Sequence, residues 1–308
     1  MTRLQDLAAL AGCSTATVSR ALRDDPRINV ETRTRIWQLA YDVDYPLAKY
    51  LGGRSGAPAS SSLSIVIPRR PSRTVSLREP FLLELLAQIG DEARFHEIDL
   101  RLTHFAPSNE VELNEFFDSV VGDPVIVLGQ GLLHEALNEV AKRRRNMVVW
   151  GARQEEQNYC SVGTDNYAGG LRATPHLISQ GRRNLVFLGD IIGPEMTQRY
   201  RGFCEATAAA GVSATLVRSR LDVNVAARAI QGHLARGTRF DGIVAVNDVS
   251  AIGAINVLIR SGLSIPDDVS IVGYDDIQHC HYVRPMLSTV SQNVTGSARS
   301  SPRRCWAT

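Results

Sequence analysis

The chain has 308 residues, of which 44% are hydrophobic and 21% are charged, and its formal net charge at pH 7 is +2. This composition is typical of a globular protein, and a charge so close to zero excludes a protein that coats nucleic acid along its whole surface. No apolar run reaches the roughly 18 residues of a membrane-spanning helix. The N-terminus has no apolar signal-peptide core, so we expect a cytoplasmic protein.

Five cysteines are scattered along the chain, and none belongs to a CxxC motif. This spacing favours reduced thiols over disulfides or a zinc site. The tripeptide His279-Cys280-His281 fits no standard spacing of metal ligands, so a loop at the mouth of a binding site is the better interpretation. We therefore expect neither a metal nor a cofactor.

Residues 3–22 contain two short helical patterns around a tight turn. The apolar residues of the first pattern recur at the spacing of one helix face: Leu4, Leu7, Ala8 and Ala11. Gly12 permits the positive φ of a sharp reversal, and Ser14 can cap a second helix. Val18 would fill the angle between the two helices. The pattern predicts a DNA-binding helix-turn-helix, and an ordinary surface hairpin of helices is the alternative.

The outward positions of the second helix suit contact with DNA, because short hydrogen-bonding side chains gather near its start. Arg20 can donate two hydrogen bonds to one guanine. We expect three residues to read base edges: Thr15, Ala16 and Arg20. Three more would hold phosphates near the helix N-terminus: Ser14, Thr17 and Ser19.

A third helical pattern follows, which Asn29 can cap and whose first turn contains Glu31. Its apolar face includes Ile36 and Ala40. Residues 1–45 are therefore predicted to form a three-helix headpiece. Because three short helices bury little apolar surface, we expect the headpiece to be only marginally stable alone.

Three runs near the N-terminus form a specific combination: Asp6-Leu7-Ala8, Ala11-Gly12-Cys13-Ser14 and Thr17-Val18-Ser19-Arg20. Together with residues 30–36, they resemble the lac-repressor (LacI/GalR) family of bacterial transcription regulators. The resemblance continues to about Gln292. It implies a helix-turn-helix headpiece followed by a two-lobed core like that of periplasmic binding proteins, in which a small effector controls DNA binding.

Residues 46–62 connect headpiece and core. In the family, a hinge helix in this connector orders on DNA and pushes a leucine into the minor groove, and Leu51 is the matching residue. The connector is shorter than the family pattern and lacks the usual Pro-Asn. The alternative interpretation of Leu51 is a linker residue that packs on the core. The glycines and serines of residues 52–62 predict a flexible tether.

From residue 63 onwards, short apolar runs alternate with amphipathic stretches. The predicted strands are Leu63–Ile67, Val125–Leu128, Met147–Trp150, Leu185–Leu188, Gly242–Val246 and Val269–Val272. The predicted helices cover residues 81–95, 108–121, 132–143, 167–180, 197–210, 223–236 and 249–261. This alternation predicts an α/β fold, with two lobes of doubly wound parallel sheets over residues 63–292.

Polar residues follow several predicted strands, which is where ligands bind in such folds. Asn247 and Asp275 each come after a strand, and Arg199 lies near the start of a helix. The resemblance implies that these three residues contact the effector. Phe81 stands where the first lobe of the family often supplies an aromatic side chain. A cap at a strand end is the alternative for each polar residue, and together they favour a polar ligand such as a sugar.

Two other signals are weaker. Gly129-Gln130-Gly131 follows a strand, but His134 takes the place of the third glycine of a dinucleotide motif, and no acidic residue ends the next strand. A solvated turn explains the basic run at residues 142–145. The sequence contains no nucleophile elbow, paired-carboxylate motif or P-loop, so we do not expect an enzyme.

Residues 293–308 differ from the rest of the chain. From Thr295 they carry three arginines, no acidic residue and no apolar period. A long helix and closing strands normally follow in the family. We therefore expect an atypical, truncated or frame-altered tail that leaves apolar surface of the first lobe uncovered.

These observations predict a sequence-specific DNA-binding transcription regulator, a repressor, controlled by a small effector that is a sugar or sugar derivative. Two-fold symmetry leads us to expect a homodimer on a pseudo-palindromic operator in double-stranded DNA, without a membrane partner. The alternative is a sugar-binding module that serves transport or sensing without binding DNA.

Overall fold

The computed structural model describes residues 4–22, 25, 27–43, 45, 62–68, 79–103, 105–120 and 123–294. These residues fall into two compact units. One contains the N-terminal helices together with His96–Ile98, and the other begins at Ser62. Leu51 and the tail from residue 295 lie outside the described residues.

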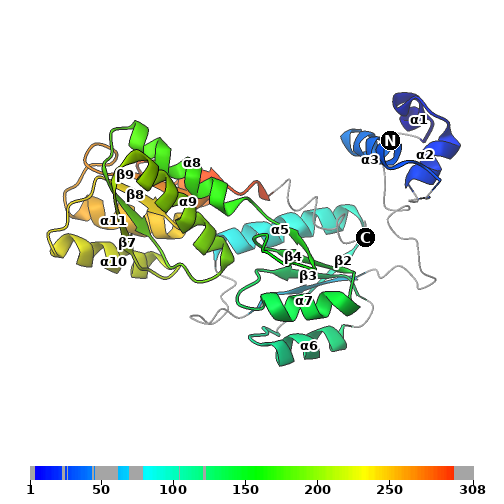
Figure 1. Ribbon diagram of the computed structural model, residues 1–308, viewed down its shortest axis with the longest axis horizontal. Helices are drawn as coiled ribbons and strands as arrows, with labels where there is room; N and C mark the ends of the chain where they lie inside the picture. The colour runs from blue at the N-terminus through cyan, green and yellow to red at the C-terminus, as the bar shows by residue number, and fades with distance from the viewer. Residues whose placement is uncertain are drawn as a thin grey trace. The chain divides into compact units, whose positions relative to one another are not determined.

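The first unit contains the helices α1 (Leu4–Ala11), α2 (Thr15–Leu22) and α3 (Val30–Asp42) (Figure 1). The turn between α1 and α2 is built as predicted. Gly12 has φ +61°, and the backbone N–H of Cys13 donates to the carbonyl of Ala8 at 3.1 Å, which closes the end of α1. The Ser14 hydroxyl accepts a hydrogen bond from the backbone N–H of Thr17 at 3.1 Å and caps α2.

The three helices share one apolar core, formed by Leu7, Ala8, Ala11, Val18, Ala21, Leu22, Ile36, Ala40 and Tyr45. Two side chains of α3 fasten it to the other helices. Arg35 donates to the carbonyl of Ala11 at 2.9 Å, and the Trp37 indole N–H donates to the carbonyl of Ala21 at 3.2 Å. Both carbonyls belong to the last turn of a helix, where no backbone donor within the helix is left for them.

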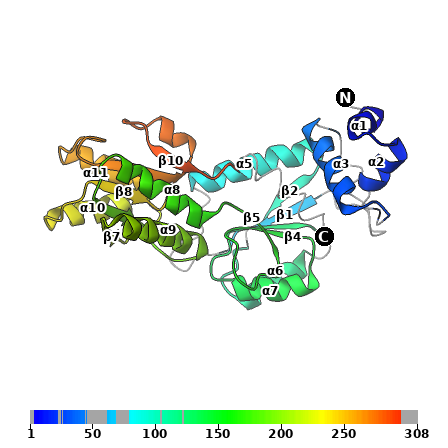
Figure 2. The ribbon, with the colours of Figure 1, turned by 45° about the horizontal axis from the view of Figure 1, so that its top comes forward.

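The second unit consists of two α/β lobes, which are separate in Figures 1 and 2. Within the described residues, each lobe has a five-stranded parallel sheet, with the strand order β2-β1-β3-β4-β5 in lobe 1 and β10-β9-β8-β6-β7 in lobe 2. The strands of lobe 1 are β1 (Ser62–Val66), β2 (Asp99–Leu102), β3 (Val125–Leu128), β4 (Met147–Trp150) and β5 (Cys160–Val162). Those of lobe 2 are β6 (Asn184–Leu188), β7 (Ser213–Val217), β8 (Gly242–Ala245), β9 (Ser270–Asp275) and β10 (Ser288–Ser291).

Helices cover both faces of each sheet, so the prediction of two doubly wound lobes is confirmed. In lobe 1 these are α5 (Pro80–Phe95) on one face and α6 (Glu110–Ser119) and α7 (His134–Arg143) on the other. Lobe 2 has α8 (Asn166–Ser179), α9 (Pro194–Ala210), α10 (Val223–Ala235), α11 (Asp248–Arg260) and the short 3-10 helix η1 (Gln278–His281). All seven predicted helices of the core are present, with ends within a few residues of the prediction.

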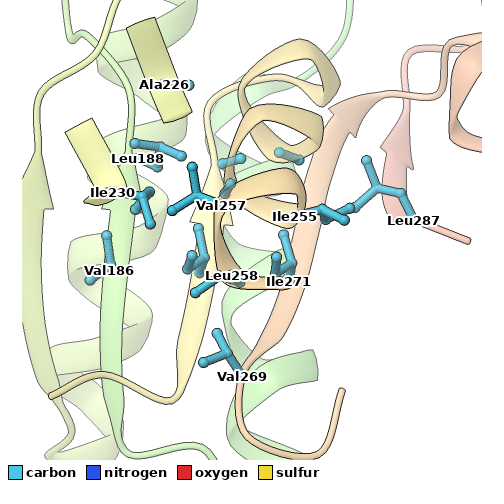
Figure 3. Close-up of a cluster of buried hydrophobic side chains, with 14 of the residues drawn as sticks. Val186, Leu188, Ala226, Ile230, Ile255, Val257, Leu258, Val269, Ile271 and Leu287 are labelled. Atoms are coloured by element: carbon cyan, nitrogen blue, oxygen red, sulfur yellow. The ribbon is translucent and has the colours of Figure 1, made fainter. Parts of the chain in front are cut away.

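The core of lobe 2 follows from the alternation of side chains along its strands. On one face of the sheet, Val186 and Leu188 of β6 pack with Ile230 of α10 and with Val257 and Leu258 of α11 (Figure 3). On the other face, Leu185 and Phe187 of the same strand pack with residues of α8 and α9. Because each central strand of the sheet is buried on both faces, it appears in the sequence as a continuous apolar run.

Four strands are absent from the predicted list, namely β2, β5, β7 and β10, and all four lie at sheet edges. Most of their side chains are exposed or half-buried, and polar residues interrupt them. An edge strand has one paired side, so it carries no continuous apolar run for a pattern search to find. Among the described residues, no helix is long and apolar enough to cross a membrane.

Helices α8 and α9 approach each other closely because glycines face each other across the contact. A Cβ atom on Gly202 would lie 2.3 Å from the carbonyl oxygen of Tyr167, and one on Gly170 would lie 2.2 Å from the carbonyl oxygen of Arg199. Both obstacles are backbone atoms, which a rotamer change cannot remove. The contact fixes where α9 presents Arg199.

We predict that Gly202→Ala forces α8 and α9 apart and lowers the free energy of unfolding by about 1–3 kcal/mol. Gly232→Ala in α10 is the matched control, because its added Cβ meets only the tip of Arg236 at 3.6 Å. That substitution should raise stability by about 0.5–1 kcal/mol, since alanine loses less backbone freedom in a helix. Urea unfolding followed by circular dichroism measures both changes, and equal effects would contradict the account.

Candidate functional site

A pocket lies between the two lobes, at the carboxyl ends of their strands. Lobe 1 lines it with Ile67, Pro68, Glu79, Phe81, Leu82, Leu85, Leu128, Gly129 and Trp150. Lobe 2 lines it with Glu195, Met196, Arg199, Leu221, Asn247, Asp275 and Gln292. All four residues proposed from the sequence as effector contacts, namely Phe81, Arg199, Asn247 and Asp275, are brought together in this pocket.

Arg199 is 7% exposed and is held by several elements of lobe 2. Its Nε donates to Oδ1 of Asn166 at 2.8 Å, and its Nη1 donates to the carbonyl of Val246 at 2.6 Å. The guanidinium carbon lies 3.6 Å from the centre of the Tyr274 ring, which is the distance of a cation–π contact. The guanidinium is therefore fixed before any ligand enters.

Asp275, the last residue of β9, faces Arg199 with 3.5 Å between Oδ1 and Nη1. Its backbone has φ +117°, a conformation that strains a residue with a side chain. The Gln292 amide donates to Oδ1 at 2.6 Å. Burial raises the pKa of the Asp275 carboxyl well above its ordinary value; Arg199 and Gln292 oppose this rise, whereas Asp248 and Glu79 add to it.

Asn247 follows β8 and is 2% exposed. Its Oδ1 accepts a hydrogen bond from the backbone N–H of Ser250 at 3.0 Å and caps α11. The cap, which was the alternative explanation for this residue, is therefore real. It leaves the amide nitrogen Nδ2 buried at the pocket without a hydrogen-bond partner in the described part of the chain. One side chain can thus cap a helix and still offer a donor to a ligand.

Aromatic rings form the wall of the pocket on the side of lobe 1. The ring of Phe81, in the first turn of α5, lies 5.9 Å from that of Trp150, at the end of β4, with the planes tilted by 45°. Phe81 also packs against the apolar core of lobe 2. This ring therefore contacts both lobes at the pocket.

Trp150 and Gln292 also line the pocket, although neither was among the predicted effector contacts. Trp150 is the last residue of β4, and Gln292 directly follows β10. Asp248, a fully buried carboxylate next to Asn247, was not predicted either. Asp248 accepts hydrogen bonds from the backbone N–H of Ile277 at 3.0 Å and from the Thr289 hydroxyl at 2.6 Å, so it braces β10 and the start of η1. Its position next to Asn247 was the available signal.

The weaker sequence signals also have places in the structure. Gln130 is fully buried, and its amide donates to the carbonyl of Ala152 at 2.6 Å and to the Tyr159 hydroxyl at 2.8 Å. It therefore ties a loop of lobe 1 together. Residues 278–281, with the buried Cys280, form η1. Within the described residues, no group of three or more histidine, cysteine or acidic side chains is arranged to hold a metal.

In the first unit, the predicted base readers Thr15, Ala16 and Arg20 are exposed on α2. Ser19 and Thr17 are half-buried, and the hydroxyls of Thr17 and Ser14 lie 2.9 Å apart in a hydrogen bond. The exposed face of α2 is therefore available to a groove of DNA, with two short hydroxyls at its N-terminus.

We predict that Asp275→Asn changes how stability depends on pH. In the wild type, the folded chain holds this carboxyl protonated above the pH at which the unfolded chain releases the proton. Its stabilising contribution is complete below about pH 4 and is lost as pH rises toward the raised pKa. The melting temperature of Asp275→Asn relative to wild type should therefore rise as the pH increases above about 4.

The exposed neighbour Asp276 supplies the control, because Asp276→Asn also removes one carboxylate. Differential scanning calorimetry at several pH values gives both comparisons. A difference between Asp275→Asn and wild type that stays constant with pH would contradict the assignment.

Comparison with known proteins agrees with the fold. A family model described as bacterial regulatory proteins, lacI family, matches residues 3–46, and one described as periplasmic binding protein-like domain matches residues 174–304. The second match runs past Gln292, where the resemblance was expected to end. The HTH-type transcriptional repressor CytR of Escherichia coli (strain K12) is 27% identical over 299 residues, 94% of this chain and 84% of that protein.

Solved structures share the fold. The complex of the transcriptional regulator CelR with cellobiose covers 98% of this chain and 91% of its own, with a TM-score of 0.65 and 23% identity. A LacI family regulator from Enterococcus faecium with bound ribose covers 79% and 88%, with a TM-score of 0.67 and 24% identity.

These relatives are transcription regulators rather than enzymes. The headpiece of this chain is a DNA-binding helix-turn-helix of the lacI type. The chain therefore combines a DNA-binding domain of the lacI family with a periplasmic binding protein-like domain.

Proposed function

We propose that this protein is a repressor that acts in the cytoplasm as a homodimer on a pseudo-palindromic operator, and that a sugar or sugar derivative in the pocket between the lobes controls it. The exposed face of α2 would read bases through Thr15, Ala16 and Arg20. Leu51, from the connector, would enter the minor groove at the operator centre.

The observation that carries the effector proposal is the buried, unpartnered amide nitrogen of Asn247 at the pocket. A buried donor without a partner is costly, so a ligand that accepts its hydrogen bond gains affinity. Arg199 and Asp275 stand beside it, fixed by their neighbours. Convergent donors and acceptors next to aromatic rings suit a ligand with hydroxyl groups on its edge and C–H groups on its faces.

Relatives support the same class of ligand. The neighbours with TM-scores of 0.65 and 0.67 hold cellobiose and ribose, respectively, and the CytR relative is a repressor. A repressor in this fold responds to its effector because the ligand contacts two lobes at once and so favours one arrangement of them.

Contacts across the pocket supply the means for such a change. The Glu84 carboxylate on α5 accepts a hydrogen bond from the backbone N–H of Gln278 at 2.9 Å, and Gln198 on α9 donates to the carbonyl of Arg153 at 3.0 Å. Each contact joins one lobe to the other through a single hydrogen bond. A ligand that strengthens or breaks them would shift the balance between lobe arrangements and, in a dimer, the spacing of the headpieces.

We predict that Arg20→Ala weakens binding to the operator by about 1–3 kcal/mol, because a guanidinium can hold one guanine with two hydrogen bonds. Arg27→Ala is the matched control. It removes the same charge from the headpiece, but Arg27 lies outside α2 and already pairs with Asp25 at 2.7 Å.

Gel shifts on the DNA upstream of the chain's own reading frame, at several salt concentrations, measure both variants. Equal losses in the two would mean that Arg20 contributes charge without reading sequence. A wild-type chain that binds this DNA no better than unrelated DNA would favour the sugar-binding module over the regulator.

We predict that Asn247→Ser separates the two roles of this residue. Serine keeps a capping oxygen for α11, so the melting temperature should change little. The amide donor is lost, and the affinity for the effector should fall about tenfold, the factor that corresponds to about 1.4 kcal/mol. Isothermal titration calorimetry with the responding sugar measures the loss. An unchanged affinity would remove Asn247 from the site.

A further inference from the structure

The two halves of the pocket differ in chemistry. In lobe 2, the carboxyl ends of β8 and β9 carry Asn247 and Asp275, and Gln292 follows β10. In lobe 1, the corresponding ends of β3 and β4 carry Leu128 and Trp150. Among the described residues of lobe 1 that line the pocket, Glu79 is the one charged side chain, and the indole N–H of Trp150 is the one other side-chain hydrogen-bonding group.

The backbone at this end of lobe 1 does not make up for the missing polar side chains. The N–H of Gly129 donates to the carbonyl of Trp150 at 2.9 Å, and the N–H of Gly151 donates to the carbonyl of Val162 at 2.9 Å. The amide donors at the ends of β3 and β4 are therefore already in use.

The polar side chain that the sequence places after β3 is also turned away from the pocket. Gln130 is fully buried, and both bonds of its amide nitrogen go to Ala152 and Tyr159 inside lobe 1. A free sugar has hydroxyl groups around its whole edge, and those that faced the apolar side chains of this wall would lose their water without gaining partners. An apolar group would gain free energy at the same wall.

We propose that the effector is a glycoside with a flat, apolar aglycone, whose sugar lies on lobe 2 and whose aglycone lies against Phe81 and Trp150 of lobe 1. This inference rests on the proposed function, since it names the class of sugar derivative that the same pocket takes. A nucleobase fits the wall less well than an aryl group, because its ring donors and acceptors would meet the apolar side chains of Leu85 and Leu128.

The test compares glycosides of one sugar that differ only in the aglycone. The full-length chain is titrated in a calorimeter with free D-glucose, methyl β-D-glucopyranoside and phenyl β-D-glucopyranoside, and with the matching sets for galactose and xylose. For the sugar that binds, we expect the phenyl glycoside to bind at least about tenfold more tightly than the methyl glycoside, because the ring adds buried apolar area.

Variants show which residues provide the higher affinity for the phenyl glycoside. Phe81→Ala should reduce the ratio of phenyl to methyl affinity to about threefold or less, and Phe81→Leu, which keeps apolar volume, should retain more of it. Asn247→Ser should weaken both glycosides by the same factor, because it acts on the sugar end. If the Phe81→Ala chain does not fold, the Phe81→Leu variant and the ratio of phenyl to methyl affinity in the wild type test the proposal instead.

Three results would overturn the inference. If the free sugar or the methyl glycoside binds as tightly as the phenyl glycoside, the inference fails and the sugar effector stands. If uridine or glucose 6-phosphate binds more tightly than every phenyl glycoside, the apolar aglycone is wrong. If no sugar or glycoside binds, the proposed effector class fails as well.

Discussion

The position of Arg199 is the constraint on which the rest of the site depends. Its guanidinium reaches the start of α8 through Asn166, the end of β8 through the carbonyl of Val246, and the end of β9 through Asp275. It can do so only because α9 lies close to α8, and that approach requires glycine at 170 and 202. Asp275, which faces this cation, has a strained backbone conformation. The geometry of the site therefore lowers the stability of the fold locally.

The parts of the fold that could be predicted from the sequence are those that local rules decide. Gly12 and Ser14 define the turn of the headpiece because a positive φ and an N-cap each demand particular residues. The central strands are buried on both faces and therefore appear as apolar runs. The edge strands β2 and β7 carry no such pattern, because most of their side chains are exposed or half-buried. Each of them pairs with a neighbouring strand on one side only.

The residues of the site likewise divide into those that a local sequence pattern marks and those that it does not. Arg199, Asn247 and Asp275 stand at strand ends or at the start of a helix, where the sequence already marks them as ligand contacts or caps. The role of Gln292 depends on the pairing of β10 with β9, which places its amide 2.6 Å from Asp275 and which no local pattern shows. The buried environment of Asp248 likewise comes from three segments that are distant in the sequence. The spacing of residues along the sequence does not show what either side chain contacts.

The central claim is that the ligand in the pocket and the operator on the headpiece act on the same equilibrium between lobe arrangements. Thermodynamic linkage then requires that the effector changes the affinity for DNA by the same factor by which DNA changes the affinity for the effector. We would measure both factors on the full chain, by fluorescence anisotropy of labelled operator and by titration of the effector with and without that operator. The account predicts two equal factors that differ clearly from one. Tight binding of both ligands with no mutual effect would contradict it.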